Sequence, residues 1–139
     1  MRARTPAGGP ARLPDVLKKP SSKTVIVELG ANDALRGLGV AQTEAALDEI
    51  LSKAKGRNLP VLILGMKAPP NLGAEYVTAF DGLYLRLAEK YQTLLYPFYL
   101  DGVAAYPALN QADGIHPNAK GVDIIVSKLK AEVEELLAK

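Results

Sequence analysis

Apolar residues follow two kinds of pattern along this chain, short continuous runs and longer stretches with helical spacing. The continuous runs are typical of strands covered on both faces, and they span residues 24–29, 61–64 and 94–96. Apolar residues at every third or fourth position predict amphipathic helices, and these span residues 11–19, 41–55, 74–91 and a last helix that starts near Pro117. We expect the last helix to bury Val122, Ile125, Val126, Leu129, Val133 and Leu136.

The order of the elements predicts the fold class. Strands that alternate with helices favour an α/β fold with a parallel sheet and helices on both of its faces. We expect an irregular segment over residues 1–10 and one α/β domain over residues 11–139. The connection after the third strand is about twenty residues long, which is unusual for a structureless loop and typical of a functional one.

Composition narrows the possible functions. The chain has 139 residues, 48% apolar and 23% charged, and a net charge of +2, so we expect one domain and no nucleic-acid partner. It has no cysteine and one histidine, so we expect no metal site and no cofactor. No apolar run reaches the length of a membrane span, and residues 1–10 contain no signal-peptide core. The sequence as written therefore predicts a cytoplasmic chain without a membrane span.

Polar motifs follow the first and third predicted strands. The only histidine, His116, lies three residues after Asp113, and the first strand ends in the sequence GAND at residues 30–33. Ligands bind at the carboxyl ends of strands in open parallel sheets, so both motifs are expected at that edge. Asp113 can orient the His116 imidazole, which can act as general base and then general acid. The Asn32 amide can donate to an oxyanion, and Gly30 allows a tight turn.

These two motifs resemble conserved blocks of a known enzyme family. The sequence VELGANDALRG at residues 27–37 and DGIHPN at residues 113–118 resemble blocks III and V of the SGNH (GDSL-type) hydrolases. The resemblance is to the thioesterase I, lysophospholipase L1 and arylesterase branch, and it extends over the chain from about residue 4. It implies a flavodoxin-like fold and a small acyl ester or thioester substrate. Members of this branch are often exported to the periplasm or secreted.

The resemblance also assigns roles to individual residues. Asp113 and His116 take the places of the catalytic acid and base, Asn32 that of an oxyanion donor, and Gly30 completes the same block. The Gly-Asp-Ser block, which carries the nucleophile on the first strand of the family, has no counterpart, and Ala3 stands where block II has glycine. The resemblance therefore implies a sheet without its first two strands and a nucleophile of unknown identity.

The remaining hydroxyl groups are poorly placed to replace that nucleophile. Ser21 and Ser22 precede the first remaining strand, roughly 20 Å from Asn32 at about 3.3 Å per residue. Ser52 is expected on the polar side of a helix, and Ser127 lies about 16 Å beyond His116 along the last helix. Thr5, in the block II region, is a weak candidate.

Three hypotheses follow. The favoured one is an esterase or thioesterase of this family whose activity is weak or absent because the nucleophile is missing. The second is an active esterase that uses an unrecognised nucleophile, or water activated directly by Asp113 and His116. The third is a non-enzymatic module that forms homo-oligomers through the exposed edge of the strand at residues 24–29.

Overall fold

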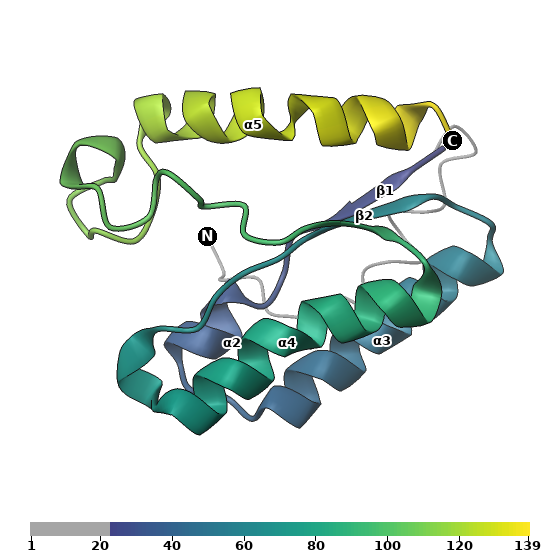
Figure 1. Cartoon of the computed structure of the whole chain (residues 1–139), viewed down its shortest axis with the longest axis horizontal. Helices are drawn as coiled ribbons and strands as arrows, with labels where there is room; N and C mark the ends of the chain where they lie inside the picture. The colour runs from purple at the N-terminus through teal and green to yellow at the C-terminus, as the bar shows by residue number, and fades with distance from the viewer. Residues whose placement is uncertain (1–22) are drawn as a thin grey trace.

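The computed structural model of the protein describes residues 23–139 (Figure 1). The expected irregular segment 1–10 and the expected helix 11–19 lie outside these residues. The elements in chain order are β1 (Val25–Val27), α2 (Ala31–Leu35), α3 (Val40–Gly56), β2 (Val61–Leu64), the 3-10 helix η2 (Pro70–Leu72), α4 (Ala74–Tyr91), β3 (Leu94–Tyr96), the 3-10 helix η3 (Pro107–Leu109) and α5 (Ala119–Leu137).

The three described strands form one parallel sheet in the order β1-β2-β3. This confirms the α/β class predicted from the alternating pattern. The predicted bounds of β2, β3 and α4 match the structure residue for residue. β1 is shorter than the expected run 24–29: the ladder pairs Val25 with Val61 and ends where Val27 pairs with Ile63.

Helices cover the two faces of the sheet unequally (Figure 1). α3 and α4 lie on one face, where their apolar sides form the main core with Val27, Val61 and Ile63. α5 lies on the opposite face and packs on Leu62 and Leu64 through a second, smaller cluster that contains Leu136. β2 is therefore buried on both faces, as its continuous apolar sequence predicts.

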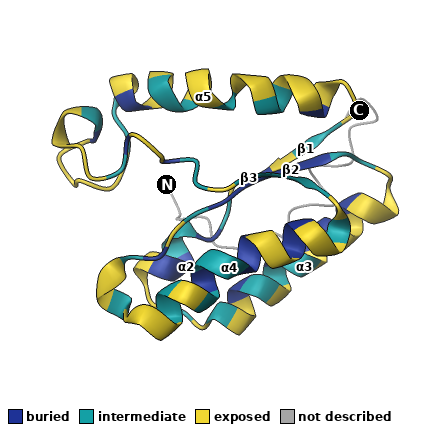
Figure 2. Cartoon of the chain, viewed as in Figure 1, coloured by how far each residue is buried: buried dark blue, intermediate teal, exposed yellow. Residues whose placement is uncertain are grey.

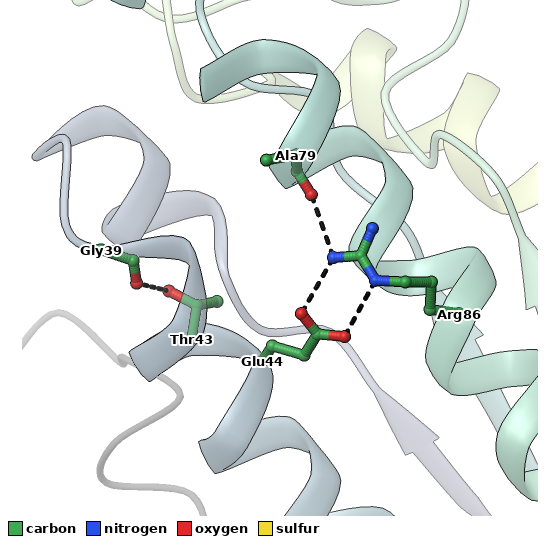
Figure 3. A network of polar contacts seen from close by, with 5 residues as sticks. All are labelled: Gly39, Thr43, Glu44, Ala79 and Arg86. Carbon is green, nitrogen blue, oxygen red and sulfur yellow. Dashed lines mark hydrogen bonds and ion pairs between the residues drawn. The ribbon is translucent and has the colours of Figure 1, made fainter. Parts of the chain in front are cut away.

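Ion pairs join α3 to α4 at the surface. The Arg86 guanidinium donates to both oxygens of Glu44, at 3.0 and 2.9 Å, and also to the Ala79 carbonyl at 3.2 Å (Figure 3). One turn further along each helix, Lys90 donates to Asp48 at 2.6 Å, and this hydrogen bond lowers the pKa of Asp48. Exposed pairs of this kind add at most about 1 kcal/mol each, so they align helices that hydrophobic packing already holds together.

Two residues expected in the core of α5 are exposed. Ile125, Leu129 and Val133 are partly buried and Leu136 is fully buried, as predicted. Val122 and Val126 are 47% and 60% exposed instead, and Figure 2 shows exposed segments along the length of this helix. The periodicity identified the apolar side of α5 correctly but overestimated how much of that side is covered.

The sheet surface beside β1 is partly open. On α5, Lys128 donates to the carbonyl and carboxylate of Asp101 in the loop that follows β3, and Val126 lies on the opposite flank of the helix. Ile26 of β1 pairs with Leu62, which faces α5, and the Ile26 side chain is 48% exposed. In the described part of the chain, the sheet is thus incompletely covered beside β1.

The turn after β1 depends on a glycine and a buried tyrosine. Gly30 has a φ angle of +115°, a conformation that side chains disfavour. The Tyr84 hydroxyl from α4 donates to the Leu29 carbonyl at 2.8 Å and occupies the space that a side chain at position 30 would need. Burial raises the pKa of Tyr84, so this hydroxyl keeps its proton and remains a donor.

We expect Gly30→Ala to reduce the free energy of unfolding by about 1–3 kcal/mol or more, because the new methyl group adds a clash to an unfavourable φ. Gly39→Ala is the matched control, since Gly39 has a φ of −57° and no neighbouring atom within 4 Å of the new Cβ. We expect that substitution to cost below about 1 kcal/mol. Chemical denaturation measures both; equal losses would contradict this account of the turn.

Candidate active site

The connection between β3 and α5 is ordered by its own hydrogen bonds. It contains η3, an antiparallel bridge between Asn110 and Pro117, and two fully or nearly buried apolar residues, Leu100 and Val103. The buried Asn110 amide donates to the carbonyls of Val103 and Tyr106 at 2.8 and 2.9 Å. Buried apolar side chains and an internally bonded asparagine therefore hold this segment in place, and the long connection is ordered.

Asp113 and His116 contact each other at the tip of this segment. Asp113 Oδ2 lies 2.6 Å from His116 Nδ1, and Asp113 Oδ1 accepts hydrogen bonds from the backbone N–H groups of Ile115 and His116, both at 3.0 Å. The Gln111 N–H donates to the His116 carbonyl at 2.7 Å and closes the turn. Both oxygens of the carboxylate are thus used, one to hold the backbone and one to orient the imidazole.

The same hydrogen bonds fix the charge of the carboxylate. The His116 side chain, followed by the backbone N–H groups, lowers the pKa of Asp113 to about 2. Asp113 is therefore ionised throughout the neutral range. Because it bonds Nδ1, the other ring nitrogen, Nε2, is the one left to accept a proton from a nucleophile. The pair is accessible from solvent, since the His116 side chain is 63% exposed.

Asn118 connects this turn to α5. Its side-chain oxygen accepts from the Gly121 N–H at 3.0 Å as the N-cap of the helix, and its amide donates to the carbonyls of Ala108 and Asn110. The helix begins at Ala119, so Pro117 precedes the cap and is not the first-turn residue we expected. An asparagine cap satisfies a free N–H of the first turn, which explains why it takes this position.

The Asn32 turn is held from α3 and α4. The buried carboxylate of Asp33 accepts a hydrogen bond from the buried hydroxyl of Thr43 at 2.8 Å. The Tyr76 hydroxyl donates to the Leu38 carbonyl at 2.6 Å at the far end of the same turn. Asn32 itself lies in α2 and is partly buried. One buried and one partly buried hydrogen bond thus fix the backbone around Asn32.

The structure brings Asp113 into contact with His116, and it places Gly30 beside Asn32 in a separate turn. Both turns lie beyond the carboxyl ends of parallel strands, at the left in Figure 1. The described serines are elsewhere: Ser52 is exposed on α3, and the exposed Ser127 on α5 donates its hydroxyl to the Asp123 carbonyl at 2.8 Å. Ser21, Ser22 and Thr5 lie outside the described residues.

An apolar groove of about 290 Å³ adjoins the Asn32 turn. α2 contributes Ala31, Ala34 and Leu35, residues 66–70 after β2 form a second wall, and the beginning of the segment after β3 forms the third. Among the described residues that line the groove, Lys67 alone is charged. A groove at this end of a parallel sheet, next to a hydrogen-bond donor, suits an apolar chain attached to a reacting carbonyl.

A parallel α/β sheet that carries an Asp–His pair and an asparagine beyond its strands is the architecture of the SGNH class of hydrolases. The model of the GDSL-like lipase/acylhydrolase family matches residues 2–124, and the chain belongs to this family. The resemblance found in the two sequence motifs is therefore confirmed at the level of the family.

Relatives of known name support the same conclusion. The chain is 44% identical over 113 residues to the esterase TesA of Pseudomonas aeruginosa, and 38% identical over 129 residues to thioesterase 1/protease 1/lysophospholipase L1 of Escherichia coli K12. These matches cover 81% and 93% of this chain, but only 56% and 62% of the relatives' own lengths.

Solved structures show the same fold. A crystal structure of TesA superimposes with a TM-score of 0.90 at 38% identity, over 96% of this chain and 74% of that chain. The SGNH-hydrolase family esterase AlinE4 superimposes with a TM-score of 0.76 at 46% identity, over 96% of this chain and 72% of its own. No helix within residues 23–139 has an apolar stretch of membrane-spanning length.

Sequence reasoning missed the residues that support the site. Tyr84 and Thr43 have the helical spacing of ordinary core residues, and nothing in that spacing shows that their hydroxyl groups reach the turn at residues 29–33. Lys67 was not singled out because a lone lysine after a strand carries no motif. The acidic Asp33 next to Asn32 was the available signal, since a carboxylate at a buried turn requires a partner.

We expect the Asp113 carboxyl group to titrate near pH 2, and His116→Ala to move its midpoint up toward the ordinary value of about 4. Because the folded pKa is lowered, the contribution of this group to stability is present above about pH 4 and is lost as the pH falls toward 2. The carbon-13 chemical shift of the carboxyl group, followed by NMR, measures both midpoints. An unchanged midpoint in the variant would show that His116 does not bond Asp113.

Proposed function

We propose that this chain carries the acid–base and oxyanion-binding part of an SGNH esterase or thioesterase, and that its substrates are small acyl esters or thioesters. The observation that carries the proposal is the 2.6 Å contact between Asp113 and His116, with the second carboxylate oxygen held by two backbone N–H groups. The names of the relatives, esterase and thioesterase, support this class of substrate.

In the proposed reaction, His116 Nε2 takes a proton from a hydroxyl group or a water molecule as its oxygen attacks the carbonyl carbon of the ester. The negative charge that forms on the carbonyl oxygen is stabilised by the Asn32 amide, and the imidazolium is stabilised by ionised Asp113. His116 then returns the proton to the leaving oxygen or sulfur as its bond to the carbonyl carbon breaks. The apolar groove beside α2 holds the acyl chain during these steps.

We propose further that the chain hydrolyses esters slowly. Neither described serine supports an efficient nucleophile, because Ser52 is exposed on α3 and the Ser127 hydroxyl is bonded to Asp123 on α5. Removing one member of a catalytic triad leaves about 10³–10⁴-fold acceleration over water in a known case. A rate of this size or lower fits a site whose hydroxyl nucleophile is missing.

We expect slow hydrolysis of p-nitrophenyl butyrate, far below the median enzyme turnover of about 10 s⁻¹. His116→Ala and Asp113→Asn should reduce the rate to background because they remove the base and its orienting partner. Asp123→Asn, an exposed aspartate on α5, is the matched control and should leave the rate unchanged.

Two outcomes would contradict parts of this proposal. A turnover typical of esterases that is abolished by His116→Ala would show that an efficient nucleophile is present, and fluorophosphonate labelling with peptide mapping would identify it. A measurable rate that is insensitive to both His116→Ala and Asp113→Asn would rule out the assigned site.

A second candidate function is self-association through the edge of β1. The observations that favour it are the 48% exposure of Ile26 and the exposure of Val122 and Val126 on α5. An antiparallel pair of β1 strands, related by a two-fold axis at Ile26, sets Thr24 of one copy opposite Glu28 of the other. The Thr24 hydroxyl of each copy can then donate to the Glu28 carboxylate of the other, so a second copy of this chain is a fitting partner.

We expect the chain to form dimers or larger species at high concentration, and Ile26→Lys to shift it toward the monomer, because a charge at an edge strand opposes pairing. Leu85→Lys is the matched control, since Leu85 is an exposed apolar residue of α4, 54% exposed and far from β1 in the sequence. Light scattering over a concentration series measures both variants. A wild-type chain that stays monomeric throughout would exclude this candidate.

A further inference from the structure

The apolar groove beside α2 has a positive charge at its mouth. Its lining is apolar except for Lys67, which follows β2 and is exposed. The Lys67 ammonium lies 5.3 Å from the centre of the Phe98 ring, and Phe98 also lines the groove. An ammonium over an aromatic face is held electrostatically, so the charge stays beside the groove rather than extending freely into solvent.

Lys67 differs from the lysines that pair with acidic side chains. Lys53, Lys90 and Lys128 each lie within ion-pair distance of a carboxylate, at 2.7, 2.6 and 3.1 Å. Lys67 contacts the Phe98 ring instead. Among the residues that the structure describes, no carboxylate lies within ion-pair distance of its ammonium group. The charge is therefore available to a ligand in the groove.

We propose that the groove binds short acyl compounds that carry a negative charge near the polar end of the chain, with Lys67 as the residue that recognises the charge. The apolar walls take the hydrocarbon and the ammonium takes a carboxylate or a phosphate. The proposal rests on the proposed function, because that function sets the direction in which the acyl group lies in the groove. It makes Lys67 a specificity-determining residue, selecting anionic over neutral and cationic amphiphiles.

The size of the groove sets the range of chain lengths. A volume of about 290 Å³ lies at the lower end of the volumes of small-molecule pockets. This favours chains of short to medium length. An eight-carbon series is therefore a suitable set of probes: octanoate and octyl phosphate as anions, octan-1-ol as the neutral compound and octylammonium as the cation.

The test is a binding titration on the full chain, followed by NMR shifts of the amides of Ala34, Leu35 and Met66 at low salt. We expect octanoate or octyl phosphate to bind about 2- to 5-fold more tightly than octan-1-ol, the range of an exposed ion pair. Lys67→Met should remove this preference and Lys67→Arg should retain it. Lys130→Met, at an exposed position of α5, is the matched control and should leave it unchanged.

Each outcome bears on the proposal. The proposal is supported if the chain prefers either anion, if Lys67→Met removes this preference and if added salt weakens it. Comparison of octanoate with octyl phosphate then distinguishes recognition of a carboxylate from recognition of a phosphate. Equal binding of octanoate and octan-1-ol would overturn it and would leave Lys67 as a cover for the Phe98 ring. Shifts at none of the three amides would overturn the groove as a binding site.

The binding result is separable from the proposed hydrolysis. His116→Ala should keep the anion preference, because the imidazole does not line the groove. A chain that binds octanoate selectively but hydrolyses no ester would contradict the proposed function alone. A chain that hydrolyses esters but does not distinguish octanoate from octan-1-ol would contradict the role of Lys67 alone.

Discussion

The burial of β2 from every side is the constraint on which the rest of this structure depends. Its four residues are between 0% and 7% exposed, and each of its edges pairs with another strand. Such a strand requires a helical layer on each face, and parallel neighbours can be joined only by crossovers that return to the same end of the sheet. The carboxyl ends of all three strands therefore face one way. The Asn32 turn, the groove and the Asp–His segment lie at that end because the chain leaves the sheet there.

The two halves of the candidate site are held by different forces. The Asn32 turn is fixed by buried groups, the Tyr84 hydroxyl on the Leu29 carbonyl and the Thr43 hydroxyl on Asp33. Breaking either bond leaves a buried polar group without a partner, which costs roughly 1–3 kcal/mol. The Asp113–His116 pair is instead exposed and depends on short-range bonds within its own turn. The turn that carries Asn32 is thus fixed by contacts with other helices, whereas the Asp113–His116 pair is fixed by bonds within its own turn and stays exposed to solvent.

Much of the fold and the family could be predicted from the sequence, because both are encoded locally. The Asp113–His116 contact is present, while the catalytic roles of these residues stay predictions. The continuous apolar runs of β2 and β3 and the spacing of α4 gave the correct bounds, and the motifs at residues 30–33 and 113–118 led to the correct family. What the sequence did not reveal depends on contacts that periodicity and motifs do not encode. The burial expected for Val122 and Val126 required knowledge of what covers α5, which periodicity does not contain. The roles of Tyr84 and Thr43 depend on hydroxyl groups that reach another element, and the order of the segment 97–118 depends on the buried Asn110.

Asn118 makes the stability of the Asp–His turn a property of α5. One side chain caps the helix through Gly121 and also bonds the carbonyls of Ala108 and Asn110 at the base of the turn. Fraying of the first turn of α5 therefore releases the segment that carries Asp113 and His116, and opening of that segment uncaps the helix. The two form one cooperative unit of local opening, which the packing of α5 on β2 and β3 stabilises. The Asp113–His116 pair can thus remain exposed to solvent without moving independently, since its order is supplied by a helix whose own anchor, Leu136, lies at the opposite end of the element.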